Sequence, residues 1–68
     1  MNPKVGDYVR TLNGIGEVIS IVPTHRYPET LQKDRLLVHH FQFNDSSLVN
    51  IANILEILDK KDYPEYQL

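Results

Sequence analysis

Three histidines are the residues whose chemistry first suggests a metal or proton-transfer site. His39 and His40 are adjacent, and His25 lies apart from them in a polar stretch. Neighbouring strand residues point to opposite faces, so His39 and His40 would not hold one ion together. Zinc needs about four ligands, and the chain has no cysteine and no His-x₃-His spacing. We therefore expect no metal or other cofactor, and polar strand histidines of which one is half-buried and pH-sensitive.

Nucleophilic or acid–base catalysis is not indicated either. The hydroxyl, histidine and carboxylate residues fall on separate short segments, with no glycine-rich phosphate loop and no paired carboxylates. A chain of 68 residues rarely encloses the pocket of about 300 Å³ or more that a small-molecule site needs. The expectation is a protein that is not an enzyme.

Basic residues are scattered rather than gathered into a stripe. Seven Lys and Arg face nine Asp and Glu, for a net charge of −2. Phosphate neutralisation supplies most non-specific nucleic-acid affinity, so this balance favours a protein partner. The alternative is a small RNA- or DNA-binding domain that uses Arg26, Lys33 and Arg35.

The elements that would position these residues begin with a hairpin at Asn13-Gly14, the strongest short signal for a two-residue turn. The pairs predicted by such a loop are Leu12–Ile15, Thr11–Gly16, Arg10–Glu17, Val9–Val18 and Tyr8–Ile19. Period-two alternation then places Val9 and Val18 on one face with Gly16. A glycine in mid-strand predicts either a sharp bend or a close backbone approach.

The middle of the chain predicts a long loop and one further strand. Residues 23–35 are polar, and a single helical turn could form over 28–33, with Pro28 at its first position. Residues 36–43 read as a strand whose apolar pattern changes phase at His39-His40. A bulge there would place Val38, Phe41 and Phe43 on one side. Residues 44–47 form a turn cluster.

Residues 48–58, "LVNIANILEIL", fit two structures. A helix would gather their apolar residues within one arc, with Ser47 as N-cap. The alternative is a strand over 48–50, a tight turn over 51–53 and a last strand over 54–58. Residues 59–68 predict a polar, loosely held tail.

The stretch "VGDYVRTLNGIGEVISI", residues 5–21, resembles the opening hairpin of small SH3-like barrels of the Tudor and KOW kind. Such barrels share a Gly-Asp-x-Val start, a Gly-x-Gly-x-Val second strand and an aliphatic residue three positions later. The matching residues are Gly6, Asp7, Val9, Gly14, Gly16, Val18 and Ile21. The hairpin is similar to those of the UvrD/PcrA C-terminal Tudor-like domain and the CarD-type polymerase-interacting domain.

The resemblance implies a mostly β, five-stranded SH3-like barrel over residues 1–58, with a short helical turn before the last strand and a tail over 59–68. In those relatives the barrel contacts RNA polymerase or another protein. The implied function is a non-enzymatic adaptor, suited to a small phage- or plasmid-type accessory protein that docks on transcription, repair or defence machinery. We expect a cytoplasmic protein without a membrane partner, and a monomer or a weak homo-oligomer formed through strand edges.

The outer face of the hairpin is the predicted partner-binding surface, because apolar side chains there would surround an Arg10–Glu17 pair. Its residues are Tyr8, Arg10, Leu12, Ile15, Glu17 and Ile19. Alternatively, the curvature of the barrel, the long loop and the tail cover Tyr8 and Ile19.

Aromatic residues offer a third kind of site, since Tudor-type modules, which the hairpin resembles, can form an aromatic cage around a methylated cation. The residues considered for it are Tyr8, Tyr27, Phe41 and Phe43. Phe41 and Phe43 are expected instead to belong to the core.

Overall fold

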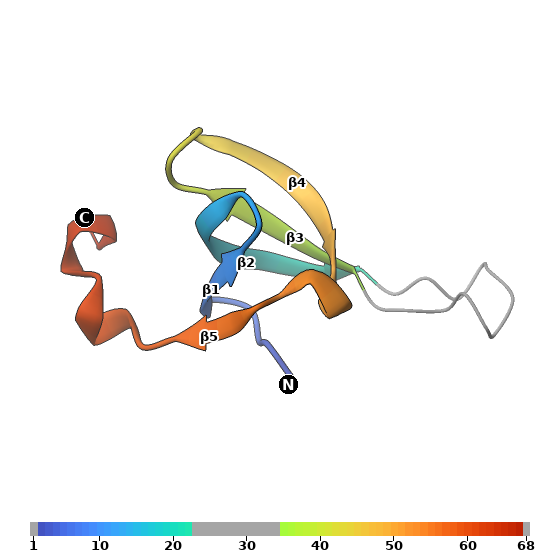
Figure 1. Cartoon of the computed structure of the whole chain (residues 1–68), viewed down its shortest axis with the longest axis horizontal. Helices are drawn as coiled ribbons and strands as arrows, with labels where there is room; N and C mark the ends of the chain where they lie inside the picture. The colour runs from blue at the N-terminus through green and yellow to red at the C-terminus, as the bar shows by residue number, and fades with distance from the viewer. Residues whose placement is uncertain (1, 23–34, 68) are drawn as a thin grey trace, which may run out of the picture.

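Five antiparallel strands form one sheet in the computed structural model, which describes residues 2–22 and 35–67 (Figure 1). The strands are β1 (Tyr8–Thr11), β2 (Gly14–Val22), β3 (Arg35–His40), β4 (Asp45–Asn50) and β5 (Glu56–Leu58). Their order is β4-β3-β2-β1-β5, so β4 and β5 are the edges of the described sheet, which stays open. The 3₁₀ turn η2 (Ile51–Asn53) precedes the last strand. The expected small, mostly β fold with five strands and this helical turn is confirmed.

The first hairpin turns one residue earlier than predicted. The observed pairs are Tyr8–Glu17, Val9–Gly16, Arg10–Ile15 and Thr11–Gly14. The loop is therefore Leu12-Asn13, and the predicted pairs are wrong. Thr11 explains the shift, because its hydroxyl accepts from the Asn13 N–H and donates to the Gly14 carbonyl, both at 3.1 Å. Gly14, with φ +98°, then supplies the positive φ at the end of the turn, a conformation that favours glycine.

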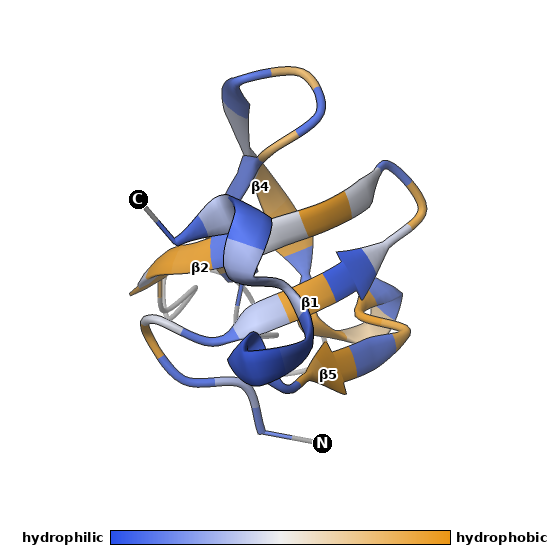
Figure 2. Ribbon diagram, turned by 90° about the vertical axis from the view of Figure 1, so that its left-hand side faces the viewer, coloured by the Kyte–Doolittle hydropathy of each residue, from blue (hydrophilic) through white to orange (hydrophobic). Residues whose placement is uncertain are grey.

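The core lies on the inner face of the sheet, as the predicted alternation requires. Val9 and Val18 are fully buried together with Val38, and Leu36, Val49 and Ile54 complete the cluster. Burying one such side chain stabilises a fold by about 1.5–3 kcal/mol. Along β1 the ribbon changes from pale to orange to blue, which follows this alternation of facing (Figure 2).

The third strand ends earlier than predicted. β3 stops at His40, and residues 41–44 form a turn in which Asn44 has φ 49°. Phe43 stands on this turn with 61% of its surface exposed, so its expected place in the core is wrong. The bulge also lies elsewhere, because the pairing shifts in β2 between Val18 and Ser20 and runs without a shift from β3 to β4.

Residues 48–58 adopt the strand–turn–strand alternative, and the helix is wrong. Asn50 ends β4 and caps η2, since its Oδ1 accepts from the Ala52 N–H at 2.9 Å. The Ile54 N–H closes the turn on the Ile51 carbonyl at 3.2 Å. Ile54 is 5% exposed, so burial of this one side chain fixes the chain where it enters the last strand.

Residues 59–67 pack against the hairpin through aromatic rings, because Tyr66 contacts Tyr8 and Phe41. Two further 3₁₀ turns, η3 (Lys60–Asp62) and η4 (Pro64–Tyr66), follow β5 (Figure 1). The Asp59 carboxylate caps η3 by accepting from the Lys61 N–H at 3.0 Å. Tyr63 and Tyr66 are half-buried, so these two aromatic residues hold a segment that is otherwise polar.

Gly16 marks a close approach of two strands. A Cβ atom at this position would lie 2.5 Å from Val38 Cγ1 and 2.6 Å from the His39 carbonyl oxygen. The second neighbour is main chain of the paired strand, so it cannot move aside without breaking the β2–β3 ladder. Of the two roles that the sequence left open, a bend or a close approach, the structure shows the close approach.

Gly16→Ala should therefore destabilise the domain by about 3 kcal/mol, the upper part of the range for overpacked cores. Chemical denaturation followed by circular dichroism measures this loss. Ser20→Ala is the control, since it changes a half-buried residue of the same strand. Equal midpoints for wild type and Gly16→Ala would contradict the close approach.

Candidate functional site at the first hairpin

The structure separates the hairpin residues that were predicted to form one docking face. Tyr8 pairs with Glu17 and Arg10 pairs with Ile15, so these four share the outer face. Leu12 instead lies on the turn, where 80% of its surface is exposed. Ile19 lies at the bulge, outside the β2–β3 pairing, with 45% of its surface exposed.

Tyr8 points outward as predicted, but it is buried, with only 3% of its surface exposed. Its ring meets Phe41 edge-on with centroids 5.2 Å apart and Tyr66 edge-on at 6.3 Å. Phe41 and Tyr66 stack on each other at 4.2 Å. Lys60 Nζ lies 5.1 Å from the centroid of the Tyr8 ring. The exposed position expected for Tyr8 is therefore wrong. The alternative, in which the tail covers this residue, is confirmed for Tyr8, which the β3–β4 turn also covers, but not for Ile19.

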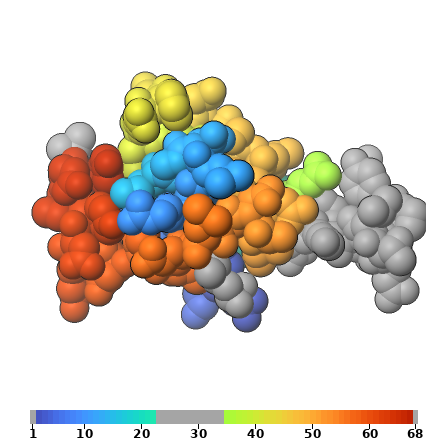
Figure 3. Space-filling view, viewed as in Figure 1, coloured from blue at the N-terminus to red at the C-terminus, as the bar shows by residue number. Residues whose placement is uncertain are grey.

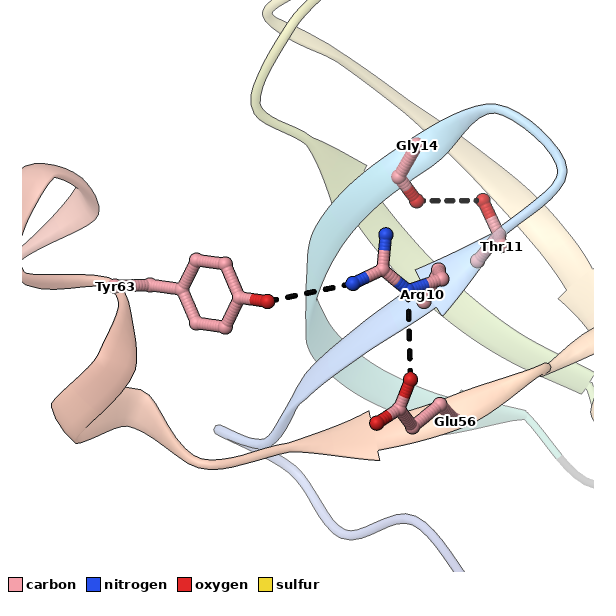
Figure 4. A network of polar contacts seen from close by, with 5 residues as sticks. All are labelled: Arg10, Thr11, Gly14, Glu56 and Tyr63. Carbon is pink, nitrogen blue, oxygen red and sulfur yellow. Dashed lines mark hydrogen bonds and ion pairs between the residues drawn. The ribbon is translucent and has the colours of Figure 1, made fainter.

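Arg10 is exposed, but its partner differs from the predicted one. Its guanidinium forms an ion pair with the Glu56 carboxylate at 3.5 Å and donates to the Tyr63 hydroxyl at 3.3 Å (Figure 4). The observed register places Ile15 opposite Arg10 on β2 and Glu56 opposite it on β5, so the Arg10–Glu17 pair is wrong. Both charged side chains are about half exposed, and such pairs add at most about 1 kcal/mol.

The aromatic residues gather differently from the cage considered above. Tyr8 and Phe41 cluster with Tyr66, whose ring also lies 6.2 Å from that of Tyr63. The 4.2 Å stacking of Phe41 and Tyr66 leaves no space for a cation between them. Phe43 stands apart on its turn, and Tyr27 lies outside the described residues.

The two adjacent histidines point to opposite faces, as predicted. His39 lies on the outer face, with Nδ1 3.4 Å from Ser46 Oγ. His40 lies on the inner face, where only 4% of its surface is exposed. Its Nε2 is 2.7 Å from Ser47 Oγ, and its buried Nδ1 has no hydrogen-bond partner in the described part of the chain. Across residues 2–22 and 35–67, no three metal-ligating side chains come together, and His25 lies outside these ranges.

A pocket of about 220 Å³ lies between the hairpin turn and β4. The space-filling view shows the blue surface of the hairpin turn beside the gold surface of β4 (Figure 3). The pocket is lined by uncharged polar residues and by apolar residues. They are Thr11, Leu12, Asn13, Ser47, Leu48, Val49, Asn50 and Asn53. Apart from Leu12, none of these was predicted to be a site residue. The lining comes from three separate segments, so no local motif could have marked it.

The basic residues of the alternative function are mostly outside the described chain. Arg26 and Lys33 fall in 23–34, as does the helical turn predicted over 28–33. Arg35 begins β3 and is exposed. Binding of RNA or DNA through these three residues stays a prediction.

Searches against protein-family models, curated proteins and solved structures returned no match. The resemblance to Tudor and KOW barrels therefore stays a prediction that rests on residues 5–21. In the described parts of the chain, no helix combines the length and apolar character needed to cross a bilayer.

The contact of the tail with the hairpin predicts a stability effect. Tyr66→Ala removes the ring that packs on Tyr8 and Phe41, and should cost about 2 kcal/mol, below the range of about 3–5 for fully buried rings because Tyr66 is half-buried. Urea denaturation measures this difference. Glu65→Ala, at the exposed neighbouring position, is the matched control. The packing role fails if the two variants unfold at the same midpoint.

Tyr8 also predicts a pH effect. Burial raises its pKa above the ordinary value of 10.0, and the carboxylates of Glu17 and Glu65 raise it further. The folded state holds the phenolic proton more tightly, so this contribution to stability is fully present below pH 10.0 and is lost as pH rises through the folded pKa. Absorbance titration of the phenolates should show one late component that disappears in Tyr8→Phe. Identical late components in both proteins would contradict this.

Proposed function

We propose that this chain is a non-enzymatic protein-interaction module that docks through the turn of its first hairpin. The observation that carries the proposal is Leu12, whose surface is 80% exposed at the tip of a hydrogen-bonded turn. Leu48, 54% exposed on β4, lines the same pocket. Exposed apolar side chains beside a pocket favour a docking surface.

The remaining residues of the predicted face contribute at the sides of this surface. The Thr11–Gly14 pair adjoins the turn, and Arg10 and Ile15 form the next cross-strand pair. Glu17 follows Ile15 on the outer face. Ile19 is exposed further along β2. Tyr8 no longer belongs to the proposed surface, because the chain's own tail covers it.

A protein is favoured as the partner over a nucleic acid. Among the described residues, no charged side chain lines the pocket beside Leu12, and the chain carries a net charge of −2. Nucleic-acid affinity depends instead on clustered positive charge. The resemblance to Tudor-like domains directs the search for a partner toward transcription, repair or defence machinery.

Leu12→Asp tests the proposal. The full chain, immobilised, is exposed to a lysate of the organism that encodes it, and captured proteins are quantified by mass spectrometry. If Leu12 anchors the interface, its replacement should cost about 2 kcal/mol and weaken capture of the specific partner about thirtyfold.

Phe43→Asp is the matched control, because Phe43 is similarly apolar and 61% exposed but stands on a different turn. Circular dichroism confirms that both variants fold. Capture that is equal for wild type, Leu12→Asp and Phe43→Asp would overturn the proposed function.

A further inference from the structure

We propose that the pocket between the hairpin turn and β4 binds the main chain of an extended, uncharged peptide segment. This inference rests on the proposed function and names the chemistry of the partner. It follows from which polar groups line the pocket, which of them are already engaged, and what lies behind Ser47.

Carboxamides dominate the polar lining. Asn13, Asn50 and Asn53 contribute them from the hairpin turn, the end of β4 and η2. A carboxamide offers two N–H donors and a carbonyl acceptor, which match the carbonyl and N–H of a peptide group. None of the lining residues in the described part of the chain is ionisable, so an anion or a cation would find no opposite charge among them.

Some of these polar groups are engaged within the fold, and others are free for a ligand. The Thr11 hydroxyl is used twice inside the hairpin turn. The side-chain Oδ1 of Asn50 accepts from the Ala52 N–H, and this hydrogen bond orients the carboxamide of Asn50. The side chains of Asn13 and Asn53 make no hydrogen bond within the described part of the chain.

His40 sets the role of the Ser47 hydroxyl. The two side chains are joined at 2.7 Å through His40 Nε2, while Nδ1 is buried without a partner among the described residues. A buried N–H without an acceptor is rarer in proteins than a buried bare lone pair, so the proton is assigned to Nε2. His40 then donates to Ser47 Oγ, and the Ser47 O–H is left to donate into the pocket. A ligand carbonyl is its natural acceptor.

Two leucines flank these polar groups. Leu12 on the turn and Leu48 on β4 are 80% and 54% exposed and line the pocket. An aliphatic side chain of the ligand, next to the bound peptide group, would cover both Leu12 and Leu48. The volume of about 220 Å³ suits one peptide unit and one side chain better than a drug-sized molecule, whose sites span about 300–1,000 Å³.

Selection from a random linear peptide library displayed on phage, against the full chain, tests the proposal. Synthetic copies of the selected peptides are then measured by fluorescence polarisation. We expect uncharged sequences with an aliphatic residue, and binding that changes little with salt, because no ion pair forms.

Paired variants of η2 locate the binding site. Asn53→Leu should weaken binding about tenfold, since it removes a carboxamide and narrows the pocket. Ala52→Leu is the matched control, because Ala52 is exposed on the same turn but does not line the pocket. Ser47→Ala should weaken binding about fivefold through the loss of one hydrogen bond.

The outcomes separate this inference from the proposed function. Failure to select peptides, or selected peptides that bind equally to wild type, Asn53→Leu and Ser47→Ala, overturns the pocket. If Ile15→Asp alone abolishes peptide binding, the chain is an interaction module that uses another face. Self-association lost in Asn53→Leu, seen by light scattering, makes the occupant a second copy and overturns the proposal. Asn53-dependent peptide binding together with lysate capture unaffected by Leu12→Asp supports the pocket and removes only the proposed docking function.

Discussion

The contact of β2 with β3 at Gly16 is the constraint on which the rest of the sheet depends. Gly16 pairs with Val9 on one side and with His40 on the other, so one residue without a side chain joins β1, β2 and β3. The β3 main chain approaches so closely that a Cβ atom would not fit. A domain this small hides only about 60% of its unfolded surface, so it has little stability with which to absorb a misplaced strand. The same register places His40 on the inner face, where it reaches Ser47.

The outer face is closed by a second, aromatic layer. Tyr8 would be an exposed ring on this face, but Phe41 covers it from the β3–β4 turn and Tyr66 covers it from the tail. Arg10 reaches Tyr63 of the same tail. The tail therefore takes the part of the hairpin face nearest Tyr8 out of contact with any partner. What stays open is the end of the hairpin at Leu12.

The strands and their facing could be predicted from the sequence, because alternation depends only on neighbouring residues. Val9 and Val18 point inward with either loop. Moving the loop by one position shifts the pairing by two residues, from Val9–Val18 to Val9–Gly16, and a shift of two keeps each side chain on the same face. The position of the turn could not be predicted from the Asn13-Gly14 pair alone. The Thr11 hydroxyl forms hydrogen bonds to Asn13 and Gly14 that favour a loop one residue earlier. Cover of Tyr8 by the tail was expected only as an alternative, and the ring that provides it could not be identified. Tyr66 lies in a polar segment, and its partner is distant in sequence.

The pocket is a consequence of how the edges of the sheet end. β4 is an edge strand, separated from the first hairpin by β3 in the sheet order, and the chain leaves it through η2; the pocket is lined by residues of the hairpin turn, β4 and η2. Polar groups at such a place cannot all be satisfied by the ladder. Thr11 and Asn50 use theirs to build the two turns, whereas Asn13, Asn53 and the Ser47 hydroxyl have capacity left over. A solvent-accessible pocket with spare donors and acceptors but no charge discriminates by hydrogen-bond geometry rather than by electrostatic attraction. It therefore favours a neutral, directional ligand, and the peptide group fits that description with few atoms.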